Sequence, residues 1–282
     1  MVSLYALGIA FLDEYIHLED LSIPLALPGL LGTAISLILG FRISQSYDRW
    51  WEARKIWGSI VNDSRSLVRQ VLTHVKQKSP KKEVYEIATQ TADLQIAWCY
   101  ALSTALRDGD PLANHGNYLT PEQLEYLKTQ NNVPNGILVL HAERLRKAEE
   151  SEWVNGFQAK LIDATLTSLT DSMGMCERIK NTVFPRTYAV IVEFLLYLFV
   201  LMLPFGIIDF FGYWEAPIVI LISLPFFLLE KTAIHLQDPF QSLPTDTPMT
   251  TISQGIEVTL KQMVQDEVPD IKVDTHGSFY LM

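Results

Sequence analysis

The stretch ISLILGFRISQSYDRWWEAR, residues 35–54, begins as an uncharged apolar segment and ends as a strongly charged one. It contains no proline or asparagine, so a helix that starts in the apolar half can continue into the charged half. The apolar half belongs to a longer run, residues 21–41, that has no charged side chain. A helix needs roughly 20 residues to cross the hydrocarbon core of a bilayer. The stretch therefore predicts one helix that leaves a membrane and continues into water.

Three further apolar runs complete a set of four predicted membrane segments. They are MVSLYALGIAF at residues 1–11, a segment from about Tyr188 to Ile208, and APIVILISLPFFLL at residues 216–229. The first has no basic residues before it, so we interpret it as a membrane segment whose start is missing or clipped, and not as a signal peptide. Pro24 and Pro28 are expected to bend or break the second segment. The fourth is expected to be too short to span unless its flanks are buried against other helices. The alternative for all four runs is the buried core of a soluble protein.

The positions of the basic residues predict the topology. Of the 22 Lys and Arg residues, 19 lie between Arg42 and Arg186, and the other three follow the last apolar run. Basic residues near a membrane segment stay on the cytoplasmic side. The sequence thus predicts a multi-pass protein of the cell's inner (plasma) membrane with both termini in the cytoplasm.

Four regions follow from this topology. Residues 1–41 form a first transmembrane hairpin, residues 42–186 a cytoplasmic helical region, residues 187–229 a second transmembrane hairpin, and residues 230–282 a cytoplasmic tail. The two external links carry acids and no basic residue, which favours cations at the outer face. These acids are Asp13, Glu14, Glu19, Asp20, Asp209 and Glu215.

The cytoplasmic region reads as helix nearly throughout. Amphipathic or apolar periodicity predicts helices over residues 49–78, 83–106, 135–147 and 152–180. A short helix is expected after Thr120, with Thr120 as its N-cap and Pro121 at its first position. The tail begins with three prolines in ten residues and is expected to be extended, before a helix over residues 252–264. The expected fold class is an all-α membrane protein.

Two stripes mark the apolar half of the opening stretch. Large or branched side chains recur every fourth residue on one face, and small ones do so on a face about 100° away. The first stripe is Thr33, Leu37 and Phe41; the second is Gly32, Ser36 and Gly40. Small residues let membrane helices approach closely, so the second stripe predicts helix packing. If identical copies pack around an axis, the first stripe forms stacked rings that can gate a pore by dewetting. Ordinary helix packing, with Leu and Phe facing neighbours or lipid, is the alternative.

No motif predicts catalysis, a cofactor or a metal site. The six histidines are scattered, and the nearest pairs with acids, His141 with Glu143 and His235 with Asp238, are interpreted as surface or capping pairs. Cys99 and Cys176 have no metal-type spacing and are expected to be buried thiols. The net charge of −10 argues against a nucleic-acid partner. We therefore expect no enzyme and no bound cofactor.

Several motifs together resemble the bestrophin family of ion channels. They are Gly40-Phe41, the Arg49-Trp50-Trp51 cluster with the glutamate that follows, and the later QDPF at residues 237–240, and the spacing of the four apolar segments matches along essentially the whole chain. The sequence looks like a bacterial member. The resemblance implies a homopentamer with one central pore, an apolar neck in the membrane and a second constriction at the cytosolic end.

The resemblance also assigns roles to single positions. The neck falls on Thr33, Leu37 and Phe41, where Thr33 replaces the family's usual apolar residue with a hydroxyl. The cytosolic constriction corresponds to Phe184. The calcium site of animal members is not expected, because QSLPTD after the DPF motif supplies only Asp246 as an acid, whereas Ca²⁺ takes six to eight oxygen ligands.

The predicted function is a homopentameric channel in a lipid bilayer that passes small monovalent ions. The resemblance to bacterial members and the acidic external links favour cations such as sodium. Two alternatives stay open: a chloride- or anion-selective channel, and a non-conducting membrane-anchored helical adaptor.

Overall fold

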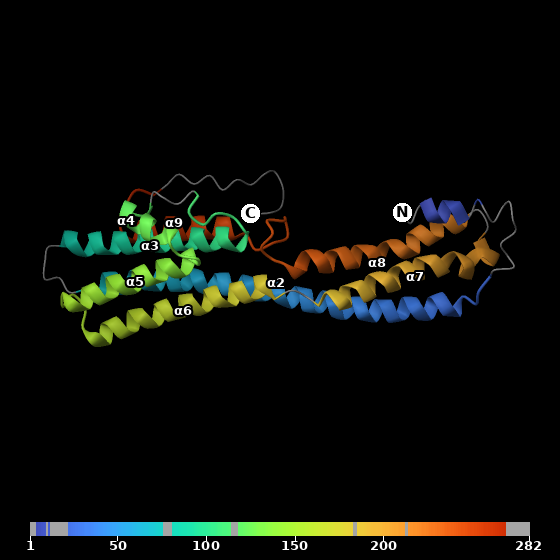
Figure 1. Ribbon diagram of the computed structural model, residues 1–282, viewed down its shortest axis with the longest axis horizontal. Coiled ribbons are helices and arrows are strands. Elements are labelled where there is room, and N and C mark those ends of the chain that lie inside the picture. The colour runs from blue at the N-terminus through green and yellow to red at the C-terminus, as the bar shows by residue number, and fades with distance from the viewer. Residues whose placement is uncertain are drawn as a thin grey trace. The chain divides into compact units, whose positions relative to one another are not determined.

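The computed structural model describes residues 4–9, 11, 22–75, 81–113, 118–182, 185–211 and 214–268. All regular elements in these ranges are helices (Figure 1). They are α2 (Ala26–His74), α3 (Lys81–Leu106), α4 (Pro121–Lys128), α5 (Val133–Glu150), α6 (Gly156–Asn181), α7 (Arg186–Phe211), α8 (Glu215–Gln237) and α9 (Met249–Met263).

The chain divides into two compact units. The membrane unit comprises residues 1–50 and 183–238, and the bundle unit comprises residues 51–182 and 239–282. Helix α2 contributes its first half to the membrane unit and its second half to the bundle unit. The predicted absence of a break within residues 35–54 is thus confirmed, because α2 runs through the whole stretch.

The prolines near the start of α2 do not break it. Pro24 precedes the helix and Pro28 lies in its first turn, where the backbone N–H that proline lacks would have had no partner within the helix. The expectation that Pro28 breaks the segment was therefore wrong, whereas the helix does begin only after Pro24. The chain leading into α2 is anchored to α7 instead, since the Ile23 N–H donates to the Phe205 carbonyl at 2.9 Å.

Three of the described helices are long and apolar enough to cross a membrane: α2, the Thr187–Ile208 part of α7, and α8. The fourth apolar run was expected to be too short, yet α8 is 23 residues long and passes through Glu230 and Lys231 to Gln237. Its charged end is part of the same helix. Of the predicted first segment, only residues 4–9 and 11 are described.

The core of the membrane unit joins α2, α7 and α8. Ile35 and Leu39 of α2 are almost fully buried in one cluster with side chains of the two other helices. The partners on α7 are Val192, Leu196, Phe199, Val200, Leu203 and Ile207, and those on α8 are Ala216 and Val219. Two helices of this unit also approach closely through a glycine, because a Cβ on Gly206 of α7 would lie 2.8 Å from Cγ of Pro28.

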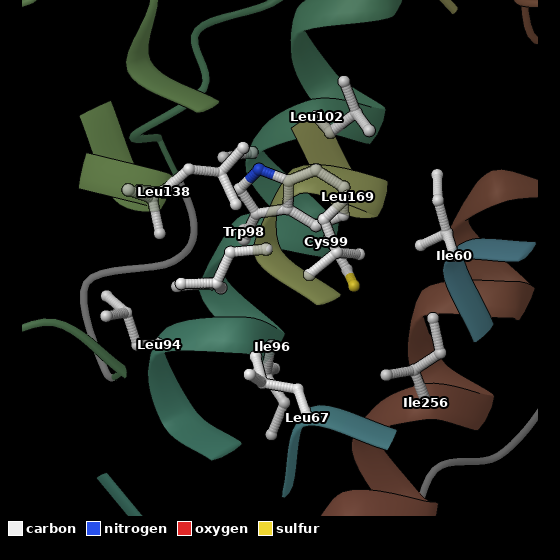
Figure 2. Close-up of a cluster of buried hydrophobic side chains, with 14 of the residues drawn as sticks. Ile60, Leu67, Leu94, Ile96, Trp98, Cys99, Leu102, Leu138, Leu169 and Ile256 are labelled. Atoms are coloured by element: carbon white, nitrogen blue, oxygen red, sulfur yellow. The ribbon is translucent and has the colours of Figure 1, made fainter. Parts of the chain in front are cut away.

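The bundle unit has a larger core around the middle of α3. Figure 2 shows Trp98, Cys99 and Leu102 of α3 among side chains from α2, α5, α6 and α9. Trp57, Ile60 and Val68, on the second half of α2, have no exposed surface. The two cysteines are buried free thiols, as predicted. Burial raises the pKa of each thiol to about 12, which keeps it protonated and unreactive.

Helix starts in the bundle unit follow capping chemistry. Thr120 caps α4 through a reciprocal capping box with Gln123, and Pro121 lies at the first position, as predicted. The helix predicted to begin at Glu152 starts later, at Gly156. Glu152 has a left-handed backbone conformation (φ 56°), and Asn155 caps α6 by a second capping box with Gln158. The preceding residues form the turn between α5 and α6.

Candidate pore-lining face of α2

One face of the membrane half of α2 is packed within the chain. Gly32, Ile35, Leu39 and Arg42 are buried at alternating spacings of three and four residues, which places them on a single face. Gly32 lies directly against α7, since a Cβ added there would be 3.1 Å from Cε2 of Phe199. This face fixes how α2 is rotated within the membrane unit.

The predicted neck stripe lies on the opposite face. At about 100° per residue, Thr33, Leu37 and Phe41 point away from the packed positions, and all three are exposed in the single chain. The exposed fraction is 64% for the Leu37 side chain and 61% for Phe41. Large apolar side chains left open on a membrane helix must contact lipid, another subunit or a pore.

Thr33 does not present a free hydroxyl proton. Its Oγ1 donates to the Gly29 carbonyl of the preceding turn at 2.9 Å. The oxygen can still accept a hydrogen bond. If five copies place Thr33 around a pore, each Thr33 would therefore offer the pore only a hydrogen-bond acceptor. That lining is less polar than one in which the hydroxyl protons were also free.

The small-residue stripe is divided between two environments. Gly32 packs against Phe199, whereas Gly40 has no atom within 4 Å of an added Cβ. Ser36 is exposed and its hydroxyl donates to the Gly32 carbonyl at 2.9 Å. Of the two glycines in this stripe, Gly32 thus packs against another helix and Gly40 does not within the described part of the chain.

Two polar contacts tie α2 to α8 just beyond the neck stripe. The Arg42 guanidinium, 2% exposed, forms an ion pair and hydrogen bond with the Glu230 carboxylate. Two turns further, Nε of Arg49 donates to the Gln237 carbonyl at 2.9 Å. A buried ion pair is costly to form but also costly to break on one side. These two contacts fix α2 against α8 at the point where the charged half of α2 begins.

The sequence reasoning treated Arg42 and Glu230 only as boundary markers. Each is the first charged residue after a long apolar run, and that coincidence was the available signal for a pair between the two helix ends. The pairing itself depends on the tertiary fold and has no signature in local spacing.

The predicted cytosolic constriction, Phe184, lies outside the described residues. Within the bundle unit, the most exposed large apolar side chain is Phe157, at 73%, at the start of α6. Leu161, one turn later, is 39% exposed. The capping box at Asn155 fixes the backbone there. The sequence reasoning missed Phe157 because it placed this residue inside a longer helix.

The expected negative outer face is only partly described. Asp13, Glu14, Glu19 and Asp20 lie outside the described residues. Glu215, at the start of α8, is 1% exposed. It was expected to add charge to the external surface, which is wrong for this residue because its carboxyl group is enclosed. A carboxylate in the first turn of a helix also interacts favourably with the helix dipole.

The two histidine pairs do not share one environment. His235 is exposed in the last turn of α8, as expected of a surface residue. His141 is 4% exposed, so the surface interpretation was wrong for it. It lies on the buried face of α5, and Glu143, two residues on, is exposed.

Comparison with known proteins places these features in a family. The family model described as "Bacterial/Fungal Bestrophin protein" matches residues 1–262. A bacterial bestrophin homologue from Klebsiella pneumoniae, solved by crystallography, superposes with a TM-score of 0.87 at 29% identity, covering 94% of this chain and 97% of the homologue. The expected all-α membrane fold of the bestrophin type is thereby confirmed.

Two curated relatives carry functional names. The voltage-dependent anion channel-forming protein YneE of Escherichia coli K12 is 33% identical over 94% of this chain and 86% of its own length. The voltage-dependent anion channel-forming protein alr2987 of Nostoc is 32% identical over 88% and 80%. Both names say anion, so they do not support the predicted preference for cations. The matched length, the identity and the fold agree: the chain belongs to the bacterial and fungal bestrophin family.

Proposed function

We propose that this chain is the subunit of a homopentameric ion channel whose narrowest part is lined by Thr33, Leu37 and Phe41. The observation that carries the proposal is the exposed stripe on α2, opposite a face that is already packed against α7 and α8. Five copies around an axis would place each stripe position in a ring. Rings of Leu and Phe close a narrow pore to ions when water leaves it.

The proposed permeant ions are small monovalent anions. The support is the printed function of the relatives, which are named as anion channel-forming proteins. The acceptor oxygen of Thr33 and the apolar rings of Leu37 and Phe41 carry no net charge, so the neck residues themselves do not set a charge preference. Charge selection would then depend on the wider parts of the pathway.

A second narrow ring is proposed at the cytosolic end of the ion pathway. Phe184 holds this role by resemblance, and Phe157 is a second candidate because its aromatic ring is exposed and its backbone is fixed by the Asn155 cap. Replacing each by alanine in turn distinguishes them. The residue at the constriction will change ion flux, whereas the other will not.

The proposed location is the inner membrane, with both chain ends in the cytoplasm. The support is the concentration of basic residues between Arg42 and Arg186 and after the last apolar run. Cysteine-labelling of intact cells, with single cysteines introduced near each end in a Cys99→Ala, Cys176→Ala background, should leave both ends unlabelled by an impermeant reagent.

The channel is tested by ion flux from liposomes that contain the purified protein. Phe41→Ala and Leu37→Ala should raise flux by removing apolar rings. The matched control is Phe194→Ala on α7, because Phe194 is 62% exposed and Phe41 is 61% exposed. If the two phenylalanine variants conduct alike, Phe41 contacts lipid or protein and does not line a pore.

Charge selectivity needs a separate measurement in planar bilayers. In a KCl gradient, the reversal potential should lie near the equilibrium potential of chloride. A reversal near that of potassium would overturn the anion assignment and leave the channel standing. The absence of current from wild type and neck variants alike would leave a membrane-anchored adaptor in its place.

A further inference from the structure

A cavity of about 520 Å³ lies inside the bundle unit, away from the residues of the proposed neck. It is formed by the last turns of α2, the first turns of α3, the second half of α5 and the start of α6. This volume falls in the range of about 300–1,000 Å³ that is typical of small-molecule sites.

The wall of the cavity is mainly apolar. Aliphatic side chains from α2, α5 and α6 line it together with Trp153 from the turn before α6. These aliphatic residues are Leu67, Val71, Leu145, Ile162 and Leu166. Such a lining can enclose the hydrocarbon part of a ligand and exclude water from it.

One polar side chain in the wall lacks a partner. His141 lines the cavity, is 4% exposed, and its Nε2 atom has no hydrogen-bond partner among the described residues. Buried polar groups in native proteins are nearly always paired, so an orphan of this kind calls for a ligand or a bound water. Burial, with the nearby Arg144 charge adding to it, lowers the pKa of His141 to about 3. The ring is therefore neutral at neutral pH and can donate one hydrogen bond from one nitrogen.

Cationic groups from the same helix lie beside this histidine. Arg144 follows His141 by three residues on α5 and therefore shares its face, and Lys147 follows one turn later; both line the cavity. Arg144 donates to the backbone carbonyl of Gln90. Burial lowers the pKa of this guanidinium, which shows that the charge has lost part of its hydration.

The acids at the cavity are placed differently. Glu150 is already paired with Arg146, at 2.8 Å between Oε1 and Nη1. Glu83 and Glu86 come from the first turns of α3, on a different element from His141 and Arg144. A carboxylate group on a ligand would meet the partly dehydrated Arg144 guanidinium on the wall that also carries His141, and hydrogen bonds between a guanidinium and a carboxylate are among the stronger ones in proteins.

We propose that this cavity binds a small organic monoanion, with its carboxylate held by Arg144 and His141 and its apolar body enclosed by the aliphatic wall. A molecule of the size of an arylalkanoate fits this description. The site lies wholly within the bundle unit and does not depend on the proposed ion pathway.

The test uses the full-length oligomer in lipid nanodiscs and isothermal titration calorimetry, with empty nanodiscs as the blank. The probe is 4-phenylbutyrate, and its matched controls are 4-phenylbutan-1-ol and 4-phenylbutylamine, which have the same body without the negative charge. We expect the carboxylate to bind at least tenfold more tightly than either control. No binding of the carboxylate, or equal binding of the alcohol or the amine, would overturn the proposal.

Three variants locate the site. Arg144→Gln should weaken binding of the carboxylate at least tenfold, and Ala148→Trp, which fills the cavity, should abolish it. Arg178→Gln is the matched control, because neither Arg178 nor its partner Glu52 is among the cavity residues; its affinity should equal that of wild type. Equal losses in Arg144→Gln and Arg178→Gln would show a nonspecific charge effect and refute the assigned site. Arg144→Gln keeps the test valid if the tryptophan variant does not fold.

Discussion

The two halves of α2 have the same secondary structure but opposite surroundings. In the bundle unit, Trp57, Ile60 and Val68 are completely enclosed by the other helices of the same chain. In the membrane unit, α2 is enclosed on one face only, and Leu37 and Phe41 remain more than half exposed on the other. The difference indicates that the bundle half is completed by one chain, whereas the membrane half is completed by something outside it.

The largest effect is expected from a matched pair of aromatic substitutions on α2. Trp57→Ala should lower the free energy of unfolding by about 3–5 kcal/mol, because it removes a fully buried side chain and leaves a cavity. Phe41→Ala should change the stability of the single chain by about 0.5 kcal/mol or less, since most of its ring is exposed. Chemical denaturation in detergent micelles measures both. A large loss from Phe41→Ala that depends on protein concentration would show that Phe41 packs between subunits.

A similar loss is expected at the point where α2 meets the end of α8. Arg42→Met alone should cost about 3–5 kcal/mol, because it leaves the Glu230 carboxylate without its cation in a buried position. The double variant Arg42→Met, Glu230→Leu should recover most of this stability, since an apolar pair avoids the cost of burying two charges. If the double variant is no more stable than the single one, Arg42 stabilises the fold through other contacts.

A smaller effect separates two glycines of the membrane unit. Gly206→Ala should destabilise by about 1–3 kcal/mol, because the new methyl group would lie 2.8 Å from Pro28 Cγ. Gly40→Ala should be neutral or slightly stabilising within the chain, since no atom lies within 4 Å of its Cβ position and alanine favours helix. Thermal unfolding of the two variants compares them directly. Loss of the oligomer in Gly40→Ala, seen by native mass spectrometry, would place Gly40 in a subunit contact.

The smallest effect near neutral pH is the dependence of bundle stability on pH. His141 is neutral in the folded state because burial lowers its pKa to about 3, whereas an unfolded histidine takes up a proton below about pH 6.5. The unfolded state therefore binds more protons as the pH falls from 6.5 toward 3. The contribution of neutral His141 to the free energy of unfolding is complete above pH 6.5. It is lost as the pH falls from 6.5 toward 3, and the free energy of unfolding then decreases by up to about 1.4 kcal/mol per pH unit.

The variant that tests this pH dependence replaces the histidine by an aromatic side chain that does not titrate. His141→Phe should flatten the stability profile between pH 6.5 and 4 relative to that of the wild type. Thermal unfolding at half-unit pH steps provides the measurement. Parallel profiles for wild type and His141→Phe would mean that the imidazole is accessible to protons in the folded chain.

Local chemistry explains why much of the fold was predictable. The start of α4 follows from Thr120, Pro121 and Gln123, whose roles depend only on neighbouring residues. The continuity of α2 follows from the absence of helix-breaking residues in the opening stretch. The alternation of packed and exposed faces on α2 also follows from helical periodicity, although the sequence did not show which face meets α7.

The errors share a tertiary origin. Helix α8 extends through Glu230, whose carboxylate pairs with Arg42, 188 residues away in the chain. His141 was assigned to the surface because its burial depends on α2, α3 and α6 together. The start of α6 was misplaced by four residues because a left-handed turn at Glu152 is invisible to periodicity. The oligomer and the role of Phe184 remain predictions.

The continuity of α2 constrains how its coding sequence can change in length. Each residue inserted near Trp50 would rotate every position before it by about 100° relative to every position after it. One inserted residue would thus change, by about 100°, the angle around the helix axis between the neck stripe and the face that carries Trp57. Seven inserted residues would restore this angle to within about 20°. Insertions and deletions at this junction should therefore be rare among functional relatives and should have lengths near a whole number of helical turns, such as about 7, 11 or 18 residues.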